Sequence, residues 1–178
     1  TLLHARHIVI ATGSHALKPQ LPGAALGGTS DDFFALQAPP ARVAIVGGGY
    51  IAVELAGVMQ ALGSDVTLLV RGQRLLTGFD AGMTEQLARN LAAQGVAVHF
   101  ACQVQALQRH RDGIQPHLQG GPADAVFDTV LFATGRAPST HGLGLEAALV
   151  ALDGKGAIVV DAFQDTSVPG ISAVGDVT

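Results

Sequence analysis

The sequence has one cysteine, Cys102, and no tryptophan among its 178 residues. A single cysteine cannot form an internal disulfide or a four-cysteine metal site, so we expect Cys102 to be a small buried side chain at the end of a strand. The seven histidines form no His-x-x-x-His pair and have no acidic partner at ligand spacing. The sequence therefore predicts no metal centre.

Charged residues are also few, at 13%, and they give a formal net charge of -4 without any run of lysine or arginine. Binding to a nucleic-acid backbone requires several clustered cations, so we do not expect this class of partner. No apolar run approaches the roughly 20 residues of a membrane span. We therefore expect a soluble, cytoplasmic protein without membrane contact.

Glycine, in contrast, is abundant: 23 glycines accompany a hydrophobic content of 48%. This composition is typical of a globular α/β protein with many turns. The length suits one full domain plus a further piece of about a third of that size. We expect one domain at residues 29–140, flanked at residues 1–28 and 141–178 by two segments of another domain.

Hydrophobic patterning predicts strands that alternate with helices, which is typical of a parallel sheet in a Rossmann-like three-layer α/β domain. Residues 104–126 have a polar alternating pattern with turn signals, so we expect an antiparallel meander on one face of the sheet. Strands are expected at residues 7–11, 42–46, 65–70, 96–100, 129–133 and 157–160, with a last strand ending at residue 176. Helices are expected at residues 31–37 (one turn), 50–62 (apolar face Ile51, Leu55, Val58 and Leu62) and 81–94 (apolar face Met83, Leu87 and Leu91).

The tripeptide Ala-Thr-Gly follows two of the expected strands, at residues 11–13 and again at residues 133–135. A repeated motif of this kind indicates two related domains, although coincidence is the alternative explanation for two segments this short. The strand at residues 7–11 and the tail at residues 156–178 lie outside the central strand and helix pattern. We expect these two segments to be neighbours in space.

A glycine turn joins the strand at residues 42–46 to the helix that starts at Tyr50. The sequence Gly47-Gly48-Gly49-Tyr50-Ile51-Ala52 fits the dinucleotide-binding pattern, and its place between a buried strand and an amphipathic helix gives the pattern its meaning. Gly47 permits the tight turn, Gly49 lets a pyrophosphate approach the backbone, and Ala52 allows close packing of helix and strand. The free amides of the helix N-terminus favour phosphate binding, so the turn predicts a dinucleotide site.

The residue after the second strand of this unit selects between NAD and NADP. An acidic side chain there holds the ribose hydroxyls of NAD, but here the residue is Arg71. A guanidinium group suits a phosphate in both charge and geometry, so Arg71 favours NADPH. For Arg74, three residues on, a phosphate contact and a solvated loop charge are both open interpretations.

The order of these motifs resembles the glutathione reductase family. The resemblance rests on residues 47–57, Leu62-Gly63, Val70-Arg71 and Phe79-Asp80 for the nicotinamide domain, and on residues 11–13 and 169–176 for parts of the flavin domain. It implies that residues 29–140 bind NADPH and that residues 1–28 and 141–178 are partial FAD-domain strands. The chain is then an internal fragment of such an enzyme.

The resemblance also implies individual roles. Tyr50 covers the nicotinamide pocket until the cofactor displaces it, and Glu54 lies near the carboxamide and a flavin-side lysine from outside this chain. Glu54 is either a buried charge that needs a partner or an exposed helix carboxylate. Arg136 lies at the adenosine side, and Asp176 accepts hydrogen bonds from the flavin ribityl chain. The residues expected to bind NADPH are Gly47, Gly48, Gly49, Tyr50, Ile51, Glu54, Arg71, Arg74, Ala133, Thr134, Gly135 and Arg136, and those expected to bind FAD are Thr12, Gly13, Gly175 and Asp176.

The family chemistry runs from NADPH through FAD and an active-site disulfide to glutathione disulfide, in an enzyme that is a homodimer through its C-terminal domain. The redox cysteines and the catalytic histidine of that chemistry lie outside this chain, so we expect the fragment itself to be inactive. The chain has Thr77 where the family usually places a second phosphate-binding arginine, which weakens the expectation of strict NADPH use. Alternatives are a trypanothione, mercuric or dihydrolipoamide reductase, the last disfavoured by Arg71, and a stand-alone dinucleotide-binding module without redox function.

Overall fold

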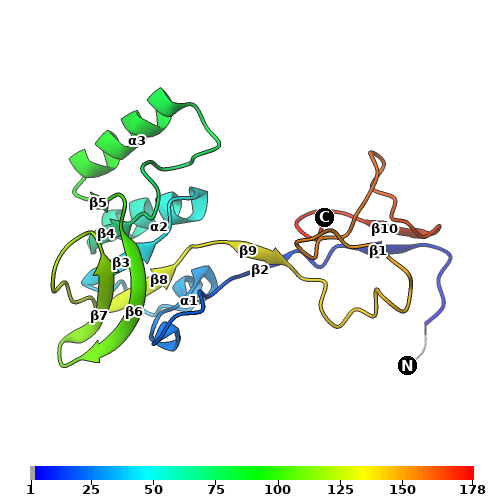
Figure 1. The fold of residues 1–178 in the computed structure, drawn as a ribbon, viewed down its shortest axis with the longest axis horizontal. Coiled ribbons are helices and arrows are strands. Elements are labelled where there is room, and N and C mark those ends of the chain that lie inside the picture. The colour runs from blue at the N-terminus through cyan, green and yellow to red at the C-terminus, as the bar shows by residue number, and fades with distance from the viewer. Residues whose placement is uncertain (1–2) are drawn as a thin grey trace. The chain divides into compact units, whose positions relative to one another are not determined.

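The computed structural model describes residues 3–178 (Figure 1). The chain forms two compact units, one of residues Ala16–Gly135 and one of the residues up to His15 together with Arg136–Thr178. The expected domain limits at residues 28 and 140 stay a prediction, because compactness alone does not assign a function to a segment. The two units are described separately below.

A parallel sheet forms the centre of the unit at Ala16–Gly135. Its strand order is β5-β4-β3-β8, and each neighbouring pair is parallel. The strands are β3 (Arg42–Val46), β4 (Asp65–Leu69), β5 (Ala97–His99) and β8 (Thr129–Phe132). All four lie within the ranges expected from the sequence, so the predicted parallel sheet is confirmed.

Helices cover one face of this sheet and an antiparallel hairpin covers the other. Alternate residues of β3 show the division, because Val43 and Ile45 belong to one buried cluster and Ala44 and Val46 to another. The first cluster contains residues of α2 (Tyr50–Ala61) and α3 (Ala81–Ala93), and the second contains residues of β6 (Gln103–His110) and β7 (Gly113–Gln119). This arrangement confirms the Rossmann-like three-layer α/β fold and its antiparallel meander.

The buried face of α2 differs from the predicted one. Val58 and Leu62 are exposed, and the side chains that face the sheet are Ala52, Leu55, Ala56 and Met59. Two small alanines on this face let the helix lie close to the strands, so the stripe is shifted around the helix from the larger apolar residues. In α3 the predicted face is also partly wrong. Its buried residues are Thr84 and Leu91, while Leu87 is half-buried and Met83 is exposed.

Two short helices precede the sheet: η1 (Ala24–Leu26), a 3-10 turn, and α1 (Ser30–Phe34). Thr29 caps α1, because its side chain accepts a hydrogen bond from the Asp31 amide while the Asp32 carboxylate accepts one from the Thr29 amide at 2.7 Å. The capping box fixes where the helix begins. The helix ends three residues before the predicted limit at residue 37.

The smaller unit is built around a parallel pair of strands, β1 (Ile8–Ile10) and β10 (Ile171–Ala173). This pairing confirms that the first strand and the tail are neighbours. The predicted strand at residues 157–160 is wrong, since Ile158 and Val160 form only isolated bridges. The Asp153 carboxylate accepts hydrogen bonds from the amides of Lys155 and Ala157, which turns the chain and interrupts a ladder there.

The two Ala-Thr-Gly segments make the same set of hydrogen bonds. In the smaller unit the Ser139 amide donates to Gly13 O at 2.8 Å, and the Thr12 hydroxyl donates to Ser139 O at 2.7 Å. In the larger unit the Leu17 amide donates to Gly135 O at 3.0 Å, and the Thr134 hydroxyl donates to Leu17 O at 3.3 Å. The repeated tripeptide therefore has the same local hydrogen bonding in each unit. The short strands β2 (Ser14–Ala16) and β9 (Arg136–Pro138) follow the two tripeptides in the chain.

Within residues 3–178, none of the helices combines the length and the apolar character needed to cross a membrane. The same residues bring together no group of three or more histidine, cysteine, aspartate or glutamate side chains that suits a metal ion.

Candidate functional site

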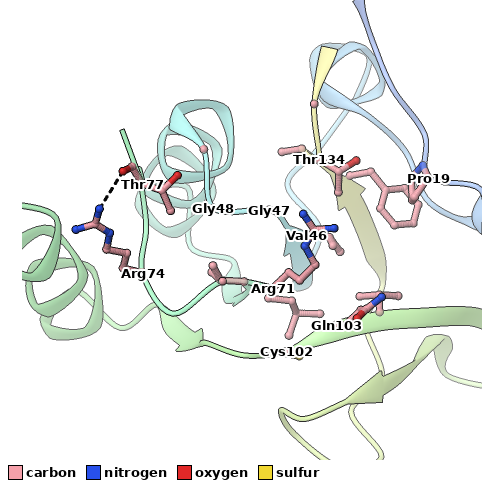
Figure 2. Close-up of a pocket in the computed structure, with 18 of the residues that line it drawn as sticks. Pro19, Val46, Gly47, Gly48, Arg71, Arg74, Thr77, Cys102, Gln103 and Thr134 are labelled. Carbon is pink, nitrogen blue, oxygen red and sulfur yellow. Dashed lines mark hydrogen bonds between the residues drawn. The ribbon is translucent and has the colours of Figure 1, made fainter. Parts of the chain in front are cut away.

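A crevice of about 580 Å³ opens in the larger unit where β3, β4 and β8 end (Figure 2). The carboxyl ends of parallel strands are where open α/β sheets bind ligands, because loops and helix N-termini meet there. Its lining residues are Pro19, Leu21, Val46, Gly47, Gly48, Gly49, Leu69, Val70, Arg71, Gly72, Arg74, Leu76, Thr77, Cys102, Gln103, Val104, Phe132, Ala133, Thr134 and Gly135. The glycine turn and both arginines singled out in the sequence therefore face one cavity.

The three glycines of the turn lie in different surroundings. Gly47 has φ 146°, and a Cβ there would lie 2.3 Å from Ala133 O. A Cβ on Gly48 would lie 2.8 Å from a methyl carbon of Val70. At Gly49 no protein atom lies within 4 Å of a Cβ, so the protein leaves open a space beside this residue.

Helix α2 begins directly after this turn, with Gly49 as its N-cap. No side chain accepts a hydrogen bond from the first turn, and the first turn has no acidic residue. The amides at a helix N-terminus lack partners within the helix and carry a partial positive charge. The start of α2 is thus free to hold an anionic group beside the open space at Gly49.

Arg71 follows β4 and its exposed side chain points into the crevice (Figure 2). It makes no ion pair or side-chain hydrogen bond with any described residue. No aspartate or glutamate is among the residues that line the crevice. The Arg71 guanidinium is therefore available to an anion from solvent.

Arg74 also lines the crevice but is directed differently from Arg71 (Figure 2). One of its terminal nitrogens donates a hydrogen bond to Thr77 O at 2.9 Å. This contact uses one of five guanidinium donors, so the remaining donors are still free to bind a ligand. The Thr77 side chain is exposed beside it, at the position where the resemblance places an arginine.

Part of the crevice wall is apolar. Cys102 and Phe132 are each 1% exposed and line the crevice with Leu21 and Val104. Burial raises the pKa of the Cys102 thiol, so this side chain stays a neutral thiol, as expected for a small buried residue. It lies between β5 and β6. An apolar wall of this kind suits the flat face of a base or a ring.

Residues Ala133, Thr134 and Gly135 continue from β8 along the same crevice. The Thr134 hydroxyl is bonded to Leu17 O, which fixes this segment to the chain that leads toward Pro19. Sequence analysis did not identify Pro19, Leu21 or Gln103 as lining residues. Pro19 and Leu21 lie in a proline-rich stretch, residues 18–23, whose composition indicates irregular backbone but no binding role. The position of Gln103 depends on how β5 connects to β6.

Four of the residues expected to bind NADPH do not line the crevice. Tyr50 is 59% exposed at the start of α2, and Glu54 is exposed one turn further on, which excludes a buried charge at Glu54 in this structure. Ile51 is half-buried and packs against the core. Arg136 lies in the smaller unit, where its guanidinium donates to the hydroxyl of Ser14 at 2.7 Å and to Ser14 O.

The residues expected to bind FAD all lie in the smaller unit: Thr12, Gly13, Gly175 and Asp176. The Ser14 hydroxyl donates to the Asp176 carboxylate at 2.8 Å and also accepts from Arg136, so it joins these two side chains. Sequence analysis did not identify Ser14. Its hydroxyl carries no signal in a single sequence, since the contact joins residues 162 positions apart.

A parallel sheet with a glycine turn and a crevice at its strand ends defines an α/β protein of the dinucleotide-binding class. Comparison with known families makes this more specific. The chain matches the pyridine nucleotide-disulphide oxidoreductase family over residues 1–178, and it belongs to that family.

Two curated relatives are glutathione reductases. The protein from Burkholderia cepacia is 48% identical over 174 residues, which are 98% of this chain and 38% of the relative. The protein from Nostoc sp. is 39% identical over 182 residues, which are 96% of this chain and 40% of the relative. This chain therefore spans about two-fifths of the length of these relatives.

Solved structures of similar fold come from Escherichia coli. The HOCl-induced flavoprotein disulfide reductase RclA superposes with a TM-score of 0.90 at 33% identity, covering 98% of this chain and 40% of that chain. Its Cu(II) complex gives a TM-score of 0.91 at 33% identity, with 98% and 41% covered. The likeness confirms the fold across nearly the whole chain.

Proposed function

We propose that this chain supplies the NADPH site of an FAD-dependent glutathione-disulfide reductase. In the whole protein, the nicotinamide would supply a hydride to FAD, and the two electrons would then reduce an active-site disulfide to two thiols. Thiol–disulfide exchange with these thiols would reduce glutathione disulfide to two glutathione molecules. This 178-residue chain binds and orients the dinucleotide, and on its own it is inactive.

The observation that supports this proposal is the joint position of the glycine turn and Arg71. Gly49 leaves open a space at the start of α2, where no side chain caps the helix and the amides suit a pyrophosphate. Arg71 points into the same crevice without a carboxylate partner. One anionic group at each place describes a dinucleotide that carries an additional phosphate on its adenosine ribose.

The rest of the crevice fits such a ligand. Arg74 and Thr77 line the same crevice as Arg71 and offer further donors to a phosphate. The apolar wall of Leu21, Phe132 and Val104 suits the adenosine. In this proposal Gly47, Gly48, Ala133, Thr134 and Gly135 form the backbone surface that the ligand follows, with Ile51 supporting the helix turn.

Three exposed side chains have cofactor roles in this proposal. Tyr50 and Glu54 lie one turn apart on the free side of α2, and in the proposal they face the nicotinamide and the flavin. Asp176, held by Ser14, accepts hydrogen bonds from the ribityl chain of FAD, together with the backbone at Thr12, Gly13 and Gly175. In this proposal Arg136 does not bind the adenosine. It donates a hydrogen bond to Ser14, the residue that holds Asp176 at the FAD site.

Other members of the class remain alternatives for the substrate, namely a trypanothione, mercuric or dihydrolipoamide reductase. Arg71 disfavours the last, because an acidic residue there favours NAD. The identity of 48% to a glutathione reductase favours glutathione disulfide. We further propose that the whole protein is a cytoplasmic homodimer joined through a C-terminal domain. A stand-alone dinucleotide-binding module is a different alternative, and it predicts NADPH binding without any flavin partner.

The proposal is tested by calorimetric titration of the chain with NADPH and NADH, before and after Arg71→Ala. We expect the parent to prefer NADPH and the variant to lose about tenfold or more of its NADPH affinity while its NADH affinity is unchanged. Arg111→Ala is the matched control, because Arg111 is exposed and bonds only to the neighbouring Asp112. Equal affinities of the parent for the two dinucleotides would refute the assignment.

A further inference from the structure

Residues 71–77, here called the arginine loop, connect β4 to the segment that leads into α3. Its start is fixed by Val70, whose amide donates to His99 O at 2.8 Å and whose carbonyl accepts from the Cys102 amide at 3.0 Å. Within the loop, Leu75 is fully buried. Arg71 therefore extends from a segment held at both sides rather than from a free loop.

Two residues that hold this loop have a left-handed backbone. Leu76 has φ 45° and Ala101 has φ 49°, values that residues other than glycine adopt uncommonly. The Leu76 amide donates to Gly48 O at 2.8 Å, and the Ala101 amide donates to Gly72 O at 3.0 Å. Each left-handed residue therefore directs its amide to one hydrogen bond that fixes the arginine loop.

Gly48 is the point where the loop and the glycine turn meet. A Cβ on Gly48 would lie 2.8 Å from a methyl carbon of Val70, the residue before Arg71. On the other side, the Gly48 carbonyl is bound by Leu76. Val70 and Leu76 thus enclose Gly48, which sets the separation between the turn and Arg71.

We propose that Leu76 and Ala101 are positioning residues that determine the preference for NADPH over NADH through the backbone hydrogen bonds by which they hold the arginine loop. The inference rests on the proposed function. NADPH carries two anionic groups at a separation set by its own bonds, so its binding depends on the distance from the turn to Arg71. NADH has only the pyrophosphate, so its binding depends on the turn alone.

A merely structural role for Leu76 predicts something different. Leu76 packs against the helix-side core, so a change there alters stability and the binding of both dinucleotides together. Selectivity, rather than affinity or stability, is therefore the informative measurement.

The first experiment compares Leu76→Ile with Leu76→Met by titration with NADPH and NADH. Both variants keep an apolar side chain of similar volume, but the β-branched isoleucine opposes a positive φ more strongly than leucine does, whereas the unbranched methionine opposes it about as much as leucine. We expect Leu76→Ile to bind NADPH about tenfold more weakly, with its NADH affinity changed by less than about threefold. Leu76→Met keeps the selectivity of the parent.

The second experiment uses Ala101, which is exposed, so that its substitution does not disturb the core. Ala101→Val opposes the left-handed backbone, and Ala101→Gly accepts it. We expect the valine variant to lose NADPH selectivity as Leu76→Ile does, and the glycine variant to keep it. Thermal unfolding of each variant, followed by circular dichroism, verifies that the compared proteins are folded.

A folded Leu76→Ile or Ala101→Val that retains the selectivity of the parent, or that weakens NADPH and NADH equally, overturns the inference. If the parent itself shows no preference, the proposed function fails and the inference fails with it. A selective parent whose variants lose affinity without losing selectivity contradicts the inference alone.

Discussion

The backbone of Gly47 lies against the carbonyl of Ala133, so close that a Cβ at residue 47 would be 2.3 Å from the Ala133 oxygen. The contact arises because β3 and β8 are adjacent and end side by side. At Gly49, two residues on, φ is -84° and a Cβ would meet no protein atom within 4 Å. Folding therefore requires glycine at position 47, whereas nothing in the folded chain requires it at position 49.

This difference predicts that Gly49→Ala separates binding from stability. The free energy of unfolding of Gly49→Ala should remain within about 0.5 kcal/mol of the parent value, because the backbone is ordinary and the space is empty. Its NADPH affinity should fall at least about tenfold, since the methyl group occupies the place of the pyrophosphate. Urea unfolding and calorimetric titration measure the two quantities.

Gly47→Ala is the matched comparison and should destabilise the chain by about 2 kcal/mol or more, because φ is 146° and the new methyl group collides with the backbone. An unchanged NADPH affinity in Gly49→Ala would show that the pyrophosphate lies elsewhere.

The pair of Arg42 and Asp128 predicts a dependence of stability on pH. Hydrogen bonds from the Arg42 guanidinium and then its amide, at 2.7 and 2.8 Å, hold the pKa of Asp128 below its usual range. A carboxyl with a lowered pKa contributes its full stabilisation above its unfolded pKa of about 4 and loses it as the pH falls through the lower folded value. The stability difference between the parent and Asp128→Asn should therefore be constant above about pH 5 and shrink as the pH falls below that value and through the lowered folded pKa.

Chemical denaturation at several pH values measures this difference. Glu85→Gln is the control, because within the described residues the Glu85 carboxylate makes no hydrogen bond or ion pair, and its effect should be small throughout. A stability difference between the parent and Asp128→Asn that stays constant down to the lowest pH would contradict the stabilising role of the Arg42–Asp128 pair.

The sequence predicted the sheet well because its strands are buried on both faces and therefore read as continuous apolar runs. The prediction of the helix faces failed, since Ala52 and Ala56 are smaller than Val58 and Leu62 although the alanines are the buried residues. The strand expected at residues 157–160 failed for another reason. Local hydrogen bonds to the Asp153 side chain replace the ladder, and apolar spacing does not report them.

In the site, sequence reasoning located the turn and Arg71 because both adjoin regular elements whose ends the pattern predicts. The network of Ser14, Arg136 and Asp176 was missed because it joins residues distant in sequence. The left-handed backbone at Leu76 could not be predicted from the sequence either, since leucine is not a residue type that favours a positive φ.

A further prediction concerns the flavin. The isolated 178-residue chain should bind NADPH weakly to moderately but should not retain FAD, because β1 and β10 form only a two-stranded sheet in the described part of the smaller unit. Flavin absorbance of the purified chain, after incubation with FAD and gel filtration, measures this. Stoichiometric FAD in the eluted protein would mean that the chain contains a complete flavin site.

The binding of NADPH is tested most directly by an NMR titration of the ¹⁵N-labelled chain with NADPH and with NADH. The central claim is that the turn at the start of α2 and Arg71 hold two phosphate groups of one ligand. The amide signals of Gly49 and Tyr50 should therefore shift with both dinucleotides, and the Arg71 side-chain signal should shift with NADPH alone. An Arg71 signal that NADPH leaves unchanged, or turn amides that respond to neither ligand, would contradict the claim.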